Sequence, residues 1–243
     1  MDAQVQARMD ELICVMINKV PRDTRTLWHS HLLELLSDTP FRIVGAGTFA
    51  QVFSHKATPD VVYKVILRTD DAYETYVNAC MESNFKYEWM PKIYAKKTVP
   101  YGAGCSTVTI VAMEKLQTIE DTEGEWYDDA DTLLNFMKIG MPTHLSNRMS
   151  TQFKQPPPRE NYRKCWRRHC RMLRDTSMWL HQWMDLYKQK SHPEMRLMMR
   201  QARKFIFLHV APKTTIREDV CTDLGIPNVM LRGKTIVLTD PVC

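Results

Sequence analysis

The sequence lacks any apolar run that reaches the roughly 20 residues needed to span a lipid bilayer. Its first residues include Asp2, Asp10 and Glu11, and they lack the basic start that is typical of a secretory signal. No internal repeat is visible. We therefore expect a soluble intracellular protein rather than a membrane-spanning, exported or repeat protein.

Paired cysteine motifs are also missing. The chain has seven cysteines at scattered positions, an odd number with no C-x-x-C pair. Neither a disulfide framework nor a zinc site is favoured by this spacing, so we expect reduced thiols. His169 lies between Cys165 and Cys170, but two thiols and one imidazole at that spacing form no recognisable metal site, and a packing role is expected.

The 243 residues suffice for one large domain or two small lobes. A net charge of +5 is unevenly distributed: residues 120–131 hold seven acids, whereas residues 154–174 hold eight basic residues against one acid. Such blocks can attract charged partners. They can equally be solvated faces that pair with each other.

Apolar periodicity predicts two helices before residue 40, at residues 5–20 and 23–36. The pattern then changes to short apolar stretches bounded by turn residues, which is typical of strands. Five strands are expected, at residues 41–44, 50–53, 61–67, 93–97 and 107–113. The links at 45–49 and 58–60 are short, so the first three strands should form an antiparallel meander, followed by a helix at 70–81.

Helix dominates from residue 116 onward. Further helices are expected at 129–138, 160–190 and 194–210, with a loop at 142–158 because consecutive prolines block helix and central strand. Trp166 and Trp183 keep helical periodicity, which favours a core role over a stacking platform for nucleic acid. Two short strands at 228–232 and 235–239 close the chain.

A glycine-rich turn and a lysine are the first candidates for chemistry. Gly45 and Gly47 lie between two predicted strands, where backbone amides could approach a triphosphate, although an ordinary hairpin turn has the same composition. Lys64 lies in an otherwise apolar strand and so calls for an anionic partner, unless it faces outward from a half-exposed strand. Glu74, or alternatively Glu82, could pair with Lys64, and Glu74 is preferred; either could instead be a surface acid.

The end of the chain supplies an acid, an amide five positions later, a hairpin and a second acid. Asp223 could accept a hydroxyl proton or orient the nucleophile, Asn228 could bind a metal, and Asp240 could bridge magnesium to phosphates. Phosphoryl transfer depends on such positioning and electrostatic stabilisation. In the alternative interpretation, Asp223 caps a loop and Asp240 closes a hairpin.

Together these segments resemble the protein-kinase fold and, most closely, the early serine/threonine protein kinases of T-seven-group bacteriophages. The resemblance rests on residues 41–52, 62–65, 111–114, 223–228 and 239–242. A Ser-His pair after the glycine-rich turn and an Asp-Pro-Val in place of Asp-Phe-Gly are its distinctive features. Ala50 stands where the usual loop has its third glycine, and Cys221 where the usual catalytic loop has histidine.

The resemblance implies an α+β fold of two kinase-like lobes. Residues 1–40 would form a helical N-terminal extension and residues 41–115 an N-lobe with an antiparallel five-stranded sheet. Residues 116–243 would form a minimal, mostly helical C-lobe that carries the catalytic and metal-binding loops.

The resemblance also implies a role for each candidate residue. Lys64 would contact the α- and β-phosphates, Asp223 would be the catalytic aspartate, and Asn228 and Asp240 would bind Mg²⁺. The loop over the phosphates and the hinge beside adenine would be formed by Gly45, Ala46, Gly47, Thr48, Phe49 and Val52, and by Met113, Glu114 and Leu116, respectively.

The implied activity is transfer of the ATP γ-phosphate to serine or threonine of host bacterial proteins, including the transcription machinery and its RNA polymerase, and to the kinase itself. The expected location is the cytoplasm of the infected host, with no membrane partner and no direct nucleic-acid binding. Two other classes stay open at this point: an inactive kinase-like binder that inhibits a host factor, and a small-molecule phosphotransferase of the aminoglycoside or choline kinase kind.

Overall fold

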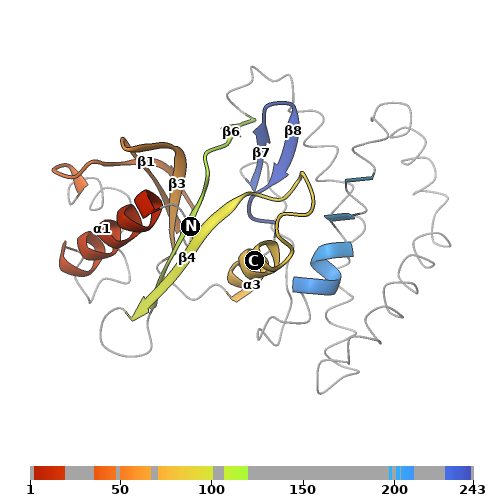
Figure 1. Cartoon of the computed structure of the whole chain (residues 1–243), viewed down its shortest axis with the longest axis horizontal. Coiled ribbons are helices and arrows are strands. Elements are labelled where there is room, and N and C mark those ends of the chain that lie inside the picture. Colours follow the sequence, from red (N-terminus) through yellow and green to blue (C-terminus); the bar gives the residue numbers. More distant parts are fainter. Residues whose placement is uncertain are drawn as a thin grey trace. The chain divides into compact units, whose positions relative to one another are not determined.

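The computed structural model divides into two compact units (Figure 1). The first comprises Met1–Asp70 with Pro91–Lys115, and the second comprises Asp71–Met90 with Leu116–Cys243. Each unit has its own antiparallel sheet. The structure describes residues 3–19, 36–47, 50–66, 71–100, 107–119, 197–198, 201–202, 204–210 and 228–241.

The first unit is built on a five-stranded sheet in which every neighbouring pair is antiparallel. Its strands are β1 (Phe41–Ala46), β2 (Ala50–His55), β3 (Thr58–Ile66), β4 (Ile93–Pro100) and β5 (Thr107–Glu114). Their order across the sheet is β1-β2-β3-β5-β4, so β5 lies between β3 and β4. The prediction of an α+β fold with a five-stranded antiparallel sheet is confirmed.

The turn before β3 is shorter than the sequence suggested. Thr58-Pro59-Asp60 was expected to separate two strands, but β3 begins at Thr58 and the turn consists of Lys56 and Ala57. Proline is tolerated here because the pairing with β2 is interrupted: His55 pairs with Thr58, and the next pair is Ser54 with Val62. The missing N–H of exposed Pro59 therefore costs no hydrogen bond of the ladder.

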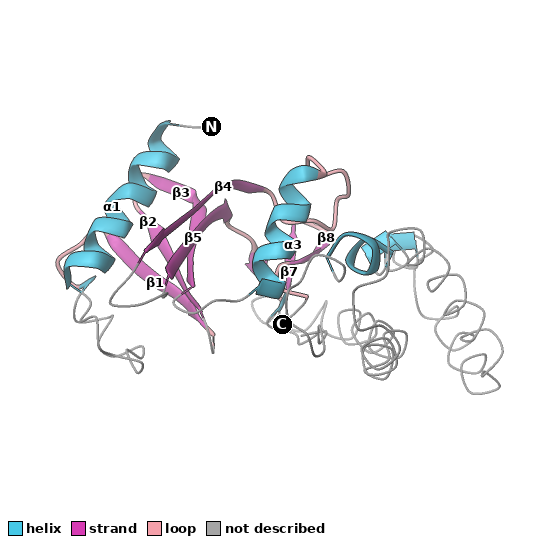
Figure 2. Ribbon diagram, turned by 90° about the horizontal axis from the view of Figure 1, so that it is seen from below, coloured by secondary structure: helices cyan, strands magenta, loops and turns pink. Residues whose placement is uncertain are grey.

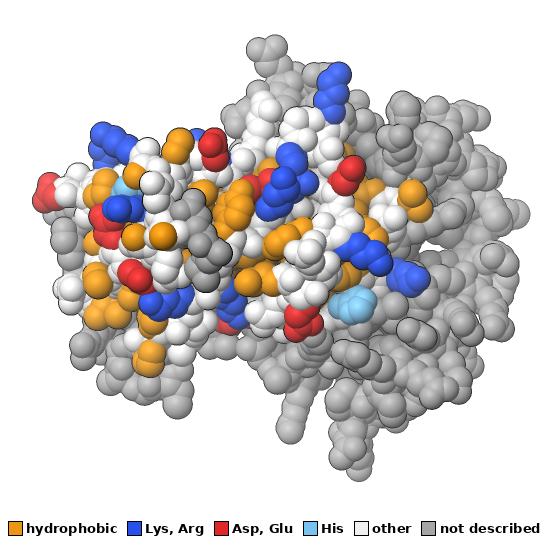
Figure 3. Space-filling view, viewed as in Figure 1, with side chains coloured by type: hydrophobic (Ala, Val, Ile, Leu, Met, Phe, Trp, Pro, Cys, Tyr) orange, Lys and Arg blue, Asp and Glu red, His pale blue; other side chains and the backbone are white. Residues whose placement is uncertain are grey.

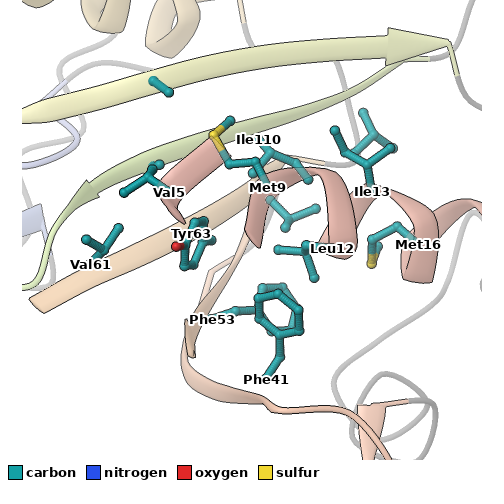
Figure 4. Close-up of a cluster of buried hydrophobic side chains, with 14 of the residues drawn as sticks. Val5, Met9, Leu12, Ile13, Met16, Phe41, Phe53, Val61, Tyr63 and Ile110 are labelled. Carbon is teal, nitrogen blue, oxygen red and sulfur yellow. The ribbon is translucent and has the colours of Figure 1, made fainter. Parts of the chain in front are cut away.

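Helix α1 (Ala3–Lys19) covers one face of this sheet (Figure 2). Its apolar residues recur three or four positions apart, which places them on one side of the helix. They meet the side chains of alternate residues of the strands (Figure 4). The resulting core includes Val5, Met9, Leu12, Ile13 and Met16 of the helix, and Phe41, Phe53, Val61, Tyr63, Val65 and Ile110 of the sheet.

A buried histidine lies at the border of this core. His55 is 5% exposed and its ring contacts Phe41 edge to face, with centroids 4.8 Å apart. Its Nδ1 accepts the Ala57 N–H at 3.0 Å, and its Nε2 lies 3.8 Å from a carboxylate oxygen of Glu11. Burial, together with the nearby positive charge of Arg8, lowers the pKa of His55, so the neutral ring is favoured.

The second unit contains α3 (Asp71–Glu82) and a three-stranded sheet. Its strands, in the order β6-β7-β8, are β6 (Gln117–Thr118), β7 (Val229–Arg232) and β8 (Thr235–Leu238). The β7–β8 hairpin agrees with the sequence pattern, and its turn uses Gly233 at a φ of 59°. The two-residue strand β6 was not predicted because so short a segment has no recognisable period.

Aromatic side chains join the loop after α3 to the segment around residue 205. Trp89 stacks on Tyr87 with centroids 5.4 Å apart and meets Phe205 edge to face at 5.6 Å. The predicted helix 194–210 is helical at residues 197–198, 201–202 and 204–205 and ends in a π-helical turn, η2 (Ile206–Val210). These contacts form the core of the second unit together with α3.

Several predicted elements lie outside the described residues. These are the helices at 129–138 and 160–190, the loop at 142–158 and all but the last residue of the helix at 23–36. Of the seven cysteines, the two in the described ranges, Cys14 and Cys80, are free thiols.

The contact between α1 and the sheet leads to a stability prediction. Replacing the fully buried Leu12 by alanine removes apolar contacts and leaves a cavity, which should lower the free energy of unfolding by about 2–5 kcal/mol. The exposed Asn18 on the same helix is the control, and Asn18→Ala should change it by less than about 0.5 kcal/mol. Urea unfolding measures both free energies. A change for Leu12→Ala as small as that for Asn18→Ala would show that the contact of α1 with the sheet does not stabilise the first unit.

The environment of His55 leads to a pH prediction. A histidine with a lowered pKa binds a proton less tightly when folded, so its stabilising contribution is complete above about pH 6.5 and is lost as the pH falls through the folded pKa. His55→Asn keeps an acceptor for the Ala57 N–H but cannot titrate. Urea unfolding at pH 7 and pH 5 should show a smaller acid-induced loss in the variant than in the wild type. An equal loss would assign the acid sensitivity to other groups.

Candidate active site

Lys64 lies on the face of the first sheet opposite to α1. Its neighbours along β3, Tyr63 and Val65, both belong to the core under α1, and successive side chains of a strand point to opposite faces. The register places Lys64 between Val52 of β2 and Val111 of β5. The same row continues outward to Gly45 on β1 and Lys96 on β4.

The surroundings of Lys64 are apolar, as its sequence neighbours suggested. Val62, Ile66 and Val111 on this face are buried, and Lys64 itself is half-buried. A lysine in such a row keeps its ammonium group near apolar surface only if an anionic or polar group faces it. Lys97, by contrast, lies on the α1 face, where its Nζ is 2.6 Å from Oδ1 of Asp10.

The glycine-rich turn follows β1 at the edge of the same sheet. Gly45 lies opposite Val52, and a side-chain carbon at Gly45 would come no closer than 3.6 Å to Val52. Gly47 is exposed, and its N–H donates to the carbonyl oxygen of Ala50 at 2.8 Å. Packing therefore does not require glycine at either position. Of the other predicted loop residues, Ala46 is exposed and Val52 half-buried, whereas Thr48 and Phe49 lie outside the described residues.

The predicted hinge lies where β5 ends. Buried Glu114 binds the backbone of Lys92 twice: its N–H donates to the carbonyl oxygen at 2.9 Å, and its Oε1 accepts the N–H at 2.7 Å. The N–H of Lys115 donates to the carbonyl oxygen of Asp60 at 2.8 Å. Met113 is buried, and Leu116 is the first residue of this segment assigned to the second unit.

In the second unit, the β7–β8 hairpin brings Asn228 and Asp240 to the same end. Val229 pairs with Leu238, so Asn228 and Thr239 are opposite each other just beyond the strands. The carbonyl oxygen of Asn228 accepts both the N–H of Thr239, at 2.9 Å, and its hydroxyl, at 3.0 Å. Asp240 follows directly and is half-buried. Two predicted metal ligands that are 12 positions apart in the sequence thus lie at the same end of the hairpin.

The donors at this end suit a hard cation. An amide oxygen from Asn228 and carboxylate oxygens from Asp240 are the ligand types that Mg²⁺ prefers. Within the described ranges, no group of three His, Cys, Asp or Glu side chains is placed to hold a metal ion. The third predicted residue, Asp223, lies outside those ranges. The magnesium-binding role of Asn228 and Asp240 therefore stays a prediction from their side-chain chemistry.

Sequence reasoning missed the residues that hold this hairpin in place. The hydroxyl of Tyr76 on α3 donates to the carbonyl oxygen of Leu238 at 2.7 Å, and the N–H of Leu238 donates to the carbonyl oxygen of Trp89 at 2.9 Å. Arg232 on β7 donates to the carbonyl oxygens of Glu88, at 2.8 Å, and Met90, at 2.9 Å. In the sequence, Tyr76 has only the apolar helical spacing of a core residue, and that pattern says nothing about its hydroxyl.

Both candidate partners of Lys64 are on α3. Glu74 is half-buried and Glu82, the last residue of the helix, is exposed. Lys64 belongs to the first unit and both glutamates belong to the second. The pairing therefore stays a prediction, as do the nucleotide-binding and catalytic roles of the other site residues.

Comparison with known proteins identifies one family. The family model described as "Bacteriophage T7 protein kinase 0.7" matches residues 18–175. The matched span contains the glycine-rich turn and Lys64 but ends before Asp223 and the β7–β8 hairpin. No curated protein matches the chain.

The hydrogen bonds of Thr239 lead to a prediction about the hairpin. Thr239→Val keeps the side-chain shape and removes the hydroxyl donor, so the free energy of unfolding should fall by about 0.5–1.5 kcal/mol. Thr239→Ser keeps the donor and serves as the control. Urea unfolding of the three proteins measures the difference. A valine variant as stable as the wild type would mean that the hydroxyl does not hold the end of the hairpin.

Proposed function

Because the chain belongs to the Bacteriophage T7 protein kinase 0.7 family, we propose that it transfers the γ-phosphate of ATP to serine or threonine hydroxyls of host bacterial proteins and of itself. The observation that supports the assignment of the site is the register of the β7–β8 hairpin, which pairs the backbone of Asn228 with that of Thr239, the residue before Asp240. This hairpin lies outside the span that matches the family model, so the proposed metal ligands are not part of that match.

The first unit supplies the nucleotide-binding part of the proposal. Protein kinases carry the phosphate-binding lysine on the third strand of their sheet, and Lys64 lies on β3 in the same cross-strand row as Gly45 of the glycine-rich turn. Lys64 would bind the α- and β-phosphates, and Gly45–Val52 would cover them. Met113, Glu114 and Leu116 would line the adenine site. The proposal places these residues in an N-lobe and the hairpin in a C-lobe of a two-lobed kinase.

The second unit supplies the reacting end of the nucleotide site. Asp223 would accept the proton of the substrate hydroxyl and orient its oxygen toward the γ-phosphorus. Asn228 and Asp240 would hold Mg²⁺, which neutralises charge on the phosphate oxygens when bound. Glu74, or alternatively Glu82, would hold Lys64 in position. The leaving group is ADP, and the hydroxyl proton passes to Asp223.

Host proteins, including RNA polymerase, are the proposed substrates, and the host cytoplasm is the proposed location. Lysine and arginine side chains of the described residues lie near acidic ones on the face shown in Figure 3. Among the described residues, no helix is both long and apolar enough to cross a membrane. The acidic block at 120–131 and the basic block at 154–174 lie outside those residues.

The test is incubation with ATP labelled at the γ-phosphate, magnesium and a bacterial lysate. Asp223→Ala, Asp240→Asn and Lys64→Met should each reduce labelling of protein by at least about 100-fold, because each removes a group that stabilises or positions the transferred phosphoryl group. Lys97→Met is the matched control, since that lysine faces α1 and binds Asp10, and it should keep most of the activity.

Each other outcome has a distinct meaning. Label on a small molecule instead of protein would indicate a small-molecule phosphotransferase. Host inhibition that survives Asp240→Asn, with no labelling by the wild type, would indicate an inactive binder. Equal labelling by the wild type and the three site variants would contradict the site assignment.

A further inference from the structure

Leu238 ends β8 two residues before Asp240, and its backbone is held from outside the sheet. Within the described residues, β8 is an edge strand, so no further strand binds its outer side. The Leu238 N–H donates to the carbonyl oxygen of Trp89, and its carbonyl oxygen accepts the Tyr76 hydroxyl at 2.7 Å. Leu238 is 0% exposed, so water does not replace these partners. The tyrosine hydroxyl thus does what a neighbouring strand would otherwise do.

Tyr76 is held firmly in this position. It lies on the buried side of α3, where Ala72, Tyr73 and Cys80 are also buried. Burial raises the pKa of Tyr76 well above its usual value, and the neighbouring Cys80 thiol, Tyr73 and the carboxylate of Asp240 act in the same direction. The hydroxyl therefore stays protonated and remains a donor. Burial also raises the pKa of the Cys80 thiol to about 12, so the thiol itself stays uncharged near neutral pH.

The two residues before Asp240 are hydrogen-bonded on opposite sides of the strand. Thr239 is bound to the carbonyl oxygen of Asn228 on the β7 side, and Leu238 is bound to Tyr76 and Trp89 on the other side. Consecutive residues held from opposite sides leave little freedom for the direction in which the chain reaches Asp240.

We propose that Tyr76 is a positioning residue of the magnesium-nucleotide site, which it serves by fixing the backbone of Leu238 and thereby the direction of the Asp240 carboxylate. This inference rests on the proposed kinase function. Tyr76 acts through the backbone and does not touch the nucleotide. Tyr76 was not among the residues predicted from the sequence. Its hydroxyl would contribute to the geometry of a metal ligand although the residue lies in the core.

Tyr76→Phe tests the proposal, because phenylalanine fills the same space without a donor. Tyr63→Phe is the matched control: it removes another fully buried hydroxyl, which is hydrogen-bonded to Oγ1 of Thr58 at 2.8 Å in the first unit. Two measurements are made on each protein. One is the Mg²⁺ concentration that gives half-maximal phosphoryl transfer, and the other is hydrogen exchange of the backbone amides of residues 236–240 without metal or nucleotide.

We expect Tyr76→Phe to raise the half-saturating Mg²⁺ concentration by about 10-fold or more, as loss of a group that orients a ligand does in other metal sites. Exchange at residues 236–240 should become faster in the same variant. Tyr63→Phe should leave both quantities close to those of the wild type. If Tyr76→Phe fails to fold, Tyr76 is replaced by 4-fluorophenylalanine, which fills the volume of the hydroxyl but lacks the donor.

Two outcomes would overturn the role of Tyr76 alone: an unchanged Mg²⁺ dependence in an active variant, or unchanged exchange at residues 236–240. If hydrogen exchange becomes faster but the Mg²⁺ dependence stays that of the wild type, Tyr76 stabilises the hairpin without positioning the metal site. A wild-type chain that neither transfers phosphate nor binds magnesium-ATP would overturn the proposed function, and this role with it. The two failures are distinguishable because the second is seen in the wild type.

Discussion

The hydrogen bonds of Leu238 are the constraint on which the candidate catalytic end of this protein depends. A buried edge strand must find partners for its outward N–H and carbonyl groups. In the second unit these partners are the Trp89 carbonyl and the Tyr76 hydroxyl, which come from α3 and the loop after it. Arg232 binds the same loop from β7. A segment far away in the sequence thereby fixes both strands of the hairpin that presents Asn228 and Asp240.

In the first unit, the alternation of side chains along β3 determines the face of the sheet on which Lys64 lies. Tyr63 and Val65 pack under α1, so Lys64 must lie on the opposite face, in line with Val52, Val111 and the glycine-rich turn. The large apolar contact with α1 therefore stabilises the sheet and also selects the face on which the lysine lies. A shift of one residue in register would move Lys64 into the α1 core, where its charge would be buried at high cost.

The family match and the hairpin concern separate parts of the chain. The match covers residues 18–175, including Lys64, whereas the hairpin lies beyond it. The sequence pattern of acid, amide and second acid predicts metal ligands, and the structure places the backbones of Asn228 and Asp240 at the same end of one hairpin. A tight hairpin returns the chain to its starting point, and Thr239 closes its end on Asn228.

The sequence by itself determined the existence of the five strands of the first sheet, α1, α3 and the position of the hairpin, because apolar periodicity and turn residues are local properties of the chain. It also placed Lys64 in an apolar strand and led to the family. It misplaced the turn before β3, since it could not show that the pairing beside Pro59 is interrupted, and it missed β6. The tertiary structure alone decided that β5 lies between β3 and β4, and that Tyr76 and Trp89 bind Leu238. Those contacts join residues more than 100 positions apart, and no local pattern records which buried hydroxyl will meet which carbonyl.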